Sequence, residues 1–91
     1  MPATVVIKVK LMPESPSEDL NAIKHHAETA LKAEGATNIS FTEEPIAFGL
    51  KAVIMKLDMP ESKGTDLVEA KLATIKGVSS VTIQDYRRAF G

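Results

Sequence analysis

The sequence lacks several residue types and has no excess of either charge. It contains no cysteine and no tryptophan, and only one tyrosine and three phenylalanines. Without cysteine, disulfides and thiolate chemistry are excluded, which fits a cytoplasmic location. Eleven basic residues stand against twelve acidic ones, for a formal net charge of −1. Because proteins that bind mainly phosphate groups usually carry a basic excess, we expect no direct nucleic-acid partner.

Long hydrophobic runs are also absent. No stretch approaches the ~20 apolar residues that span a bilayer, and the N-terminal residues mix lysines into an alternating pattern unlike a signal peptide. We therefore expect no membrane partner. The length of 91 residues is that of one domain, so residues 1–91 are interpreted as a single domain. A chain of this size buries only about 60–65% of its unfolded surface, which makes a deep active site improbable.

The first half of the sequence predicts a strand followed by a helix. Residues 3–12 alternate and are rich in β-branched side chains, which is typical of a half-buried strand. Ser15 and Glu18 flank Pro16, and proline suits the first position of a helix. The sequence therefore predicts a capped helix over residues 16–34, with Gly35 as its C-terminal stop.

The second half predicts a hairpin, a helix and a last strand. Residues 38–42 and 53–59 alternate as strands, and the segment between them is longer than a tight turn needs. A helix capped by Thr65 or Asp66 precedes a strand over residues 81–86. The order β-α-β-β-α-β predicts an α+β fold, the ferredoxin-like sandwich, in which two helices cover one face of a four-stranded antiparallel sheet.

A search for catalytic or metal-binding patterns finds none that is specific. His25 and His26 are neighbours in a predicted helix and point about 100° apart, so they do not easily share a metal ion. Glu43 and Glu44 point to opposite faces of an extended chain and cannot form a carboxylate dyad. Glu43 lies on the inward register of its strand, which suggests a salt-bridge partner; otherwise it is a solvated charge. We expect no catalytic residue, no metal site and no cofactor.

The sheet face away from the helices is predicted to mix lysines with apolar residues. Its expected members are Lys8, Lys10, Lys51, Lys56, Val6, Leu50, Ala52, Ile54 and Tyr86. Such a face occurs in two other classes of protein with this fold. One is the dimeric regulatory domain that binds a small molecule, and the other is the RNA-binding module, which stacks bases on aromatic side chains.

Two segments carry residues that the fold does not need. Pro45–Gly49 places Ile46 and Phe48 at a loop tip, where Phe48 either anchors a protein partner or folds back over the core. The C-terminal segment from Tyr86 to Phe90 is basic and aromatic. It is either a frayed terminus or a cationic surface for an acidic or phosphate-bearing partner.

Four stretches of the sequence carry a resemblance to a known family. They are Met12-Pro13-Glu14-Ser15-Pro16, Glu44-Pro45-Ile46-Ala47-Phe48-Gly49-Leu50, Lys63-Gly64-Thr65-Asp66 and Asp85-Tyr86-Arg87-Arg88. In this order they resemble the archaeal translation elongation factor 1-beta family, and the C-terminal exchange domain of its eukaryotic relatives. The motif at the hairpin is the most specific of the four.

The resemblance implies a guanine-nucleotide-exchange domain that binds the GTPase elongation factor 1-alpha. Such a domain, monomeric when free, wedges against the GTPase and disturbs its magnesium and phosphate region, with no covalent chemistry. The partner-binding residues it implies are Pro45, Ile46, Phe48, Gly49, Tyr86, Arg87 and Arg88. Eukaryotic relatives also use a lysine next to the C-terminus, whereas the last lysine here is Lys76. An arginine therefore replaces that lysine, or exchange proceeds without it.

Overall fold

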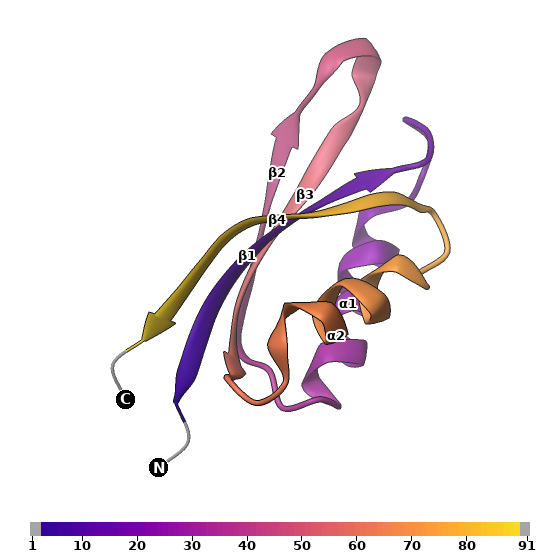
Figure 1. Ribbon diagram of the computed structural model, residues 1–91. Coiled ribbons are helices and arrows are strands. Elements are labelled where there is room, and N and C mark those ends of the chain that lie inside the picture. The colour runs from indigo at the N-terminus through magenta and orange to yellow at the C-terminus, as the bar shows by residue number, and fades with distance from the viewer. Residues whose placement is uncertain (1–2, 90–91) are drawn as a thin grey trace.

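The computed structural model describes residues 3–89, so Phe90 of the predicted C-terminal segment lies outside the described residues. The elements are β1 (Thr4–Pro13), α1 (Leu20–Lys32), β2 (Thr37–Pro45), the 3-10 turn η1 (Ala47–Gly49), β3 (Lys51–Pro60), α2 (Gly64–Ala73) and β4 (Val78–Ala89). The four strands form one antiparallel sheet in the order β2-β3-β1-β4. Both helices cover the same face of this sheet (Figure 1), which confirms the predicted ferredoxin-like α+β fold.

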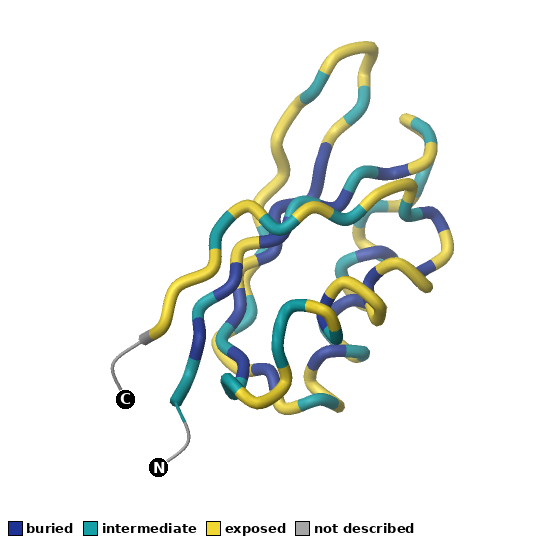
Figure 2. The backbone as a smooth tube through the Cα atoms, viewed as in Figure 1, coloured by how far each residue is buried: buried dark blue, intermediate teal, exposed yellow. Residues whose placement is uncertain are grey.

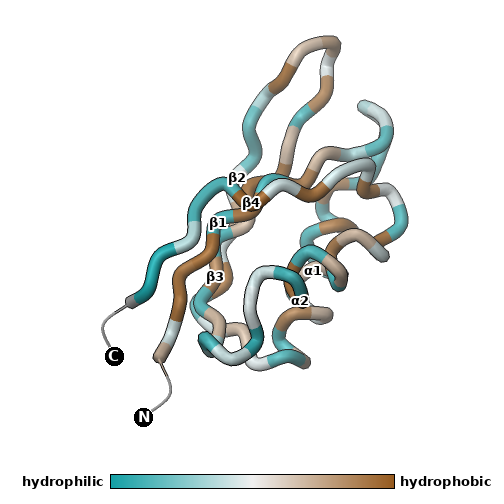
Figure 3. Tube along the Cα trace, viewed as in Figure 1, coloured by the Kyte–Doolittle hydropathy of each residue, from teal (hydrophilic) through white to brown (hydrophobic). Residues whose placement is uncertain are grey.

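The core lies between the helices and the two central strands. Alternate residues of β1 and β3 point toward the helices, and α1 and α2 each add a buried stripe. The enclosed side chains are Val5, Ile7, Val9, Leu11, Ala27, Leu31, Val53, Met55, Leu57, Met59, Val68 and Leu72. In Figure 3 the hydrophobic stretches follow the central strands, whereas the C-terminal end of β4 is hydrophilic. Full burial of each large aliphatic side chain stabilises the fold by about 1.5–3 kcal/mol, so the core supplies the stability.

The first helix begins later than the sequence predicted. α1 starts at Leu20, and its N-cap is Asp19, whose Oδ1 accepts hydrogen bonds from the N–H groups of Asn21 at 3.0 Å and Ala22 at 3.3 Å. The predicted cap, Ser15, instead shares a 2.9 Å hydrogen bond with the hydroxyl of Ser17. The predicted helix start at residue 16 is therefore wrong, because Asp19 rather than Ser15 caps the helix.

The same loop packs against the turn between α2 and β4. A Cβ atom built on Gly77 would lie 2.7 Å from Oε1 of Glu18, and the N–H of Glu14 donates to the carbonyl of Gly77 at 2.8 Å. Glu18 therefore serves a tertiary contact rather than a capping box. The second predicted cap is also wrong, since α2 begins at Gly64 with no side-chain cap, and Thr65 and Asp66 lie inside its first turn.

A register shift in β4 reverses the face on which its last residues lie. Val9 is opposite Ile83, but Lys8 is opposite Asp85, so one residue of β4 is extra at this point. A one-residue slip moves every later side chain to the other face of a sheet. Tyr86 consequently lies opposite the buried Ile7, on the helix-covered face. Its predicted place on the open face is wrong, and the RNA-binding alternative loses the aromatic on which it depended.

The β2–β3 hairpin projects beyond the body of the fold. β1 pairs with β3 as far as Val53, whereas Lys51 and Ala52 are paired only with β2. Residues 43–52 therefore form a two-stranded arm, and Figure 2 shows most of it exposed. Lys51 lies two residues from the core-facing Val53, so it is on the helix-covered face, and its predicted place on the open face is wrong.

Candidate functional site

Phe48 stands at the tip of the arm with its side chain in solvent. It is 94% exposed, which makes it the most exposed large hydrophobic residue among residues 3–89. The alternative that Phe48 folds back over the core is therefore wrong. The predicted neighbours Pro45, Ile46 and Gly49 lie beside it in the arm, and Ile46 is half-buried. The structure thus brings the four hairpin residues of the predicted site together.

The backbone of the tip holds Phe48 in a strained conformation. Its φ of 61° and ψ of 32° lie in the left-handed region, which is rare for a bulky residue. Gly49 follows with a φ of 78°, where glycine is favoured. The tip is closed by hydrogen bonds from the N–H of Ile46 to the carbonyl of Leu50 at 2.7 Å, and from Leu50 to Ala47 at 3.2 Å. The aromatic ring is thus presented outward by an ordered turn.

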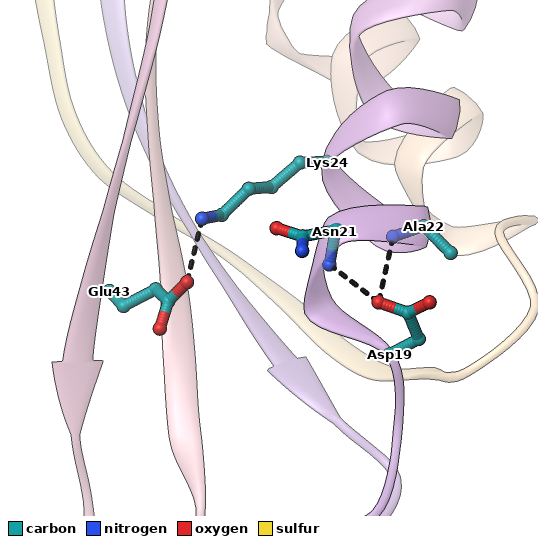
Figure 4. Close-up of polar contacts among 5 residues, drawn as sticks. All are labelled: Asp19, Asn21, Ala22, Lys24 and Glu43. Carbon is teal, nitrogen blue, oxygen red and sulfur yellow. Dashed lines mark hydrogen bonds and ion pairs between the residues drawn. The ribbon is translucent and has the colours of Figure 1, made fainter.

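An ion pair joins the base of the arm to α1. Lys24 Nζ donates to Glu43 Oε2 at 2.7 Å (Figure 4), so the predicted partner of Glu43 is confirmed and is Lys24. This hydrogen bond, then the charge of Lys24 and, more weakly, that of Lys51, lower the pKa of Glu43 below its ordinary value of 4.5. At neutral pH Glu43 is therefore ionised and paired.

This lowered pKa predicts a titration result. A carboxylate whose pKa is lowered in the folded state stabilises that state above its unfolded pKa, and the contribution disappears as pH falls through the folded value. Carbon-detected NMR should find Glu43 titrating below 4.5, the ordinary value, and moving back toward it in Lys24→Met. A Glu43 midpoint at or above that ordinary value in the unchanged protein would contradict the pairing.

A hollow of about 310 Å³ separates the arm from the loop before α1. It opens to solvent and is lined by charged and polar side chains of both sides, including Glu18, Asp19, Glu43 and Lys51. The tip of the arm approaches the far rim, where a Cβ atom built on Gly49 would lie 4.0 Å from Cβ of Pro16. Beyond the buried Ala52, the arm therefore lies close to the body without packing into it.

The predicted C-terminal site residues lie at the other end of the sheet and on different faces. Tyr86 is 46% exposed and borders a hollow of about 460 Å³ beside the first turn of α2. Arg87 lies opposite Val6 on the open face, and its Nε donates to Asp85 Oδ2 at 2.9 Å. Arg88 lies on the helix-covered face and pairs with Glu61, which raises the pKa of Arg88. This end is therefore a second cluster, remote from Phe48 (Figure 1).

Among the described residues, the other side chains considered for metal binding do not come together as a site. His25 and His26 are both exposed, with ring centroids 5.9 Å apart. Residues 3–89 contain no group of three or more His, Cys, Asp or Glu side chains placed to hold a metal ion. Neither described helix is long and apolar enough to cross a membrane.

Comparison with known proteins gives a consistent result. Residues 5–88 match the family described as the EF-1 guanine nucleotide exchange domain. The chain is 40% identical to elongation factor 1-beta of Methanothermobacter thermautotrophicus, over 92% of this chain and 94% of the relative. It is 37% identical to elongation factor 1-beta of Methanocella arvoryzae, over 97% of this chain and 99% of the relative. The chain belongs to this family.

Membership of the elongation factor 1-beta family confirms the resemblance seen in the sequence. The family consists of translation elongation factors with a guanine nucleotide exchange domain, and several further relatives are archaeal. Its matched region contains both the arm and β4 as far as Arg88. Both clusters of predicted site residues thus lie within the exchange domain.

Two residues of the candidate site were missed from the sequence. Lys24 lies on α1 next to its apolar stripe. A cation at that position could have been matched to Glu43, which lies on the inward face of its strand. Glu61 follows the proline that ends β3, and its carboxylate forms an ion pair with Arg88. Its sequence position gives no signal of this pairing, because strand register alone brings residues 61 and 88 together.

Proposed function

We propose that this chain acts as a single exchange domain that binds the GTPase elongation factor 1-alpha and promotes replacement of GDP by GTP. One observation carries the proposal: an aromatic side chain is almost fully exposed on a strained backbone at the tip of a projecting arm. A left-handed conformation costs about 1–2 kcal/mol for a residue such as phenylalanine. Neither the strain nor the exposure stabilises the free protein, whereas a partner that buries the ring offsets both.

The second cluster supplies the other contact. Tyr86 and Arg87 lie at the opposite end of a molecule whose longest extent is 45 Å. A partner that touches both clusters must therefore present two separate contact surfaces. In this arrangement the apolar arm tip anchors the complex and the cationic end acts near the phosphates and magnesium of the nucleotide site.

Exchange then follows from differential binding and requires no covalent step. Magnesium bridges the protein and the nucleotide phosphates, so weakening its coordination loosens GDP. If the domain binds the nucleotide-free GTPase more tightly than the GDP form, linkage lowers the affinity for GDP by the same factor. Each ~1.4 kcal/mol of this preference changes the affinity tenfold.

The direct test is GDP release from the cognate elongation factor 1-alpha. Stopped-flow fluorescence with labelled GDP should show release that accelerates roughly tenfold or more with added domain and saturates, corresponding to ~1.4 kcal/mol or more. Release that stays at its spontaneous rate at saturating domain would refute the proposal. In the same preparation, sedimentation should give a monomer, since a stable dimer would favour the small-molecule regulatory alternative.

A further inference from the structure

Beyond Ala52, which is fully buried at its base, the arm has little packing of its own to fix its direction. β2 reaches the core through the half-buried Ile39 and Phe41, and every β2 residue from Thr42 onward is exposed. Beyond Val53 the sheet is only two strands wide. Isolated two-stranded ribbons are marginally stable in water and twist more strongly than wider sheets. Something else must therefore hold the arm relative to the body.

One side-chain link joins the arm to the body. Lys24 of α1 bonds to Glu43, the first residue of the arm, at 2.7 Å. Within residues 3–89 no other side-chain hydrogen bond or ion pair connects the arm to the rest of the fold. The open hollow lies between the remaining arm and the loop before α1, and among the described residues no second polar side-chain contact crosses it.

The position of this link makes the arm tip sensitive to it. Glu43 lies at the base of the arm and Phe48 at its end, where the last two residues of β2 lead into the turn η1. Three extended residues at ~3.3 Å and two 3-10 residues at ~2 Å give a reach of about 14 Å, so a rotation of roughly 10° at the base would move the tip by about 2.5 Å. Such a displacement is enough to take an anchoring side chain out of the pocket that it fills.

We propose that the Lys24–Glu43 ion pair sets the direction of the arm, and that both residues are positioning residues for Phe48. The side chain of Lys24 is only 23% exposed, so its alkyl stem lies along the body and its ammonium group is already in place. The functional part of this inference rests on the proposed contact between Phe48 and the GTPase. The structural part does not, because the direction of the arm is a property of the free protein.

The pair contributes little to stability, which allows a clean test. Both side chains are partly exposed, and ion pairs of this kind are worth little to the free energy of unfolding. The variants are Lys24→Met, Glu43→Gln and the double exchange Lys24→Glu with Glu43→Lys. The double exchange keeps the combined length and the attraction of the two side chains. Lys32→Met is the matched control, because it removes the Lys32–Glu28 pair at 3.3 Å on the same helix.

The first readout is the orientation of residues 43–52 relative to the body, measured by residual dipolar couplings of the free protein. The second is the domain concentration that gives half-maximal GDP release. Both single variants should shift the couplings of the arm alone. They should also raise that concentration about threefold with an unchanged maximal rate. The double exchange should restore both readouts, and Lys32→Met should leave both at their original values.

Arm couplings that are the same in the single variants and the unchanged protein would overturn the inference. Altered couplings with an unchanged half-maximal concentration would also overturn the positioning role, provided that Phe48→Ala impairs release. If Phe48→Ala releases GDP normally, the proposed function of Phe48 fails instead, and the couplings still decide whether the pair directs the arm.

Discussion

Phe48→Ala is expected to lower the rate constant of GDP release from elongation factor 1-alpha about tenfold or more, since the loss of an anchoring side chain costs ~1.4 kcal/mol or more. The domain should remain folded, because the ring is 94% exposed and its removal opens no cavity in the core. Stopped-flow release at saturating and sub-saturating domain separates weaker binding from a slower maximal rate. An unchanged release rate would refute the role of Phe48.

Phe48→Gly separates the effect of Phe48 on GDP release from its effect on the free energy of unfolding. Glycine adopts the φ of 61° without strain, which favours the folded variant by about 1–2 kcal/mol, while its greater freedom in the unfolded chain costs about 0.5–1 kcal/mol. The free energy of unfolding, measured in urea, should therefore stay within about 1 kcal/mol of the original value. GDP release should fall as far as in Phe48→Ala. Ala47→Ser, at the neighbouring exposed position, is the control and should leave release unchanged.

Arg87→Gln is expected to slow GDP release about fivefold at low salt, the effect of losing ~1 kcal/mol of charge attraction near a water-exposed surface. Arg87 lies on the open face with its guanidinium largely in solvent, and its intramolecular partner Asp85 is also exposed to solvent. The loss should shrink as salt is raised, because exposed charges are screened. Thermal unfolding should be unchanged.

Arg88→Gln should lower thermal stability more than it lowers GDP release, the opposite of Arg87→Gln. Arg88 pairs with Glu61, and Oε2 of Glu61 is buried without a hydrogen-bond partner among the described residues. Removing the guanidinium leaves this partly buried carboxylate without its cation, so the midpoint of thermal unfolding should fall. The direct effect on GDP release should be smaller than that of Arg87→Gln.

A salt-independent, normal release rate in Arg87→Gln would exclude Arg87 as the functional cation.

These predictions share one physical pattern. Stability comes from the enclosed faces of β1 and β3 and the stripes of the helices, all in the middle of the molecule. The residues proposed to meet a partner lie at the two ends of the sheet, where the chain is exposed. Substitutions at the ends can therefore change binding with little change in folding, and substitutions in the middle should do the reverse.

The fold could be predicted from the sequence because its signals are local. Alternation in residues 3–12 and 53–59 identifies strands whatever they pair with, and apolar spacing identifies both helices. The sequence likewise predicts that Pro45–Gly49 carries either an exposed anchor for a protein partner or a side chain folded back over the core. Its exposure was decided by the structure, since the arm extends beyond the last residue of β3 that pairs with β1.

Helix starts and the face of the last residues of β4 could not be predicted in this way. Ser15 offered the expected cap, but the loop bonds to itself and to the turn at Gly77, and Asp19 caps α1 instead. Tyr86 was expected on the open face because alternation was counted without a bulge. In both places a contact with a segment distant in sequence outweighed a local preference.

The sequence by itself thus determined the order of elements, the core-facing residues and the family, since these depend on side-chain type and spacing along the chain. Only the tertiary structure decided that Tyr86 and Arg87 lie on different faces, that Lys24 holds Glu43, and that the two clusters lie at opposite ends of the sheet. These features depend on register between strands and on which helix residue meets which strand. A single inserted residue changes register while leaving the local pattern almost the same.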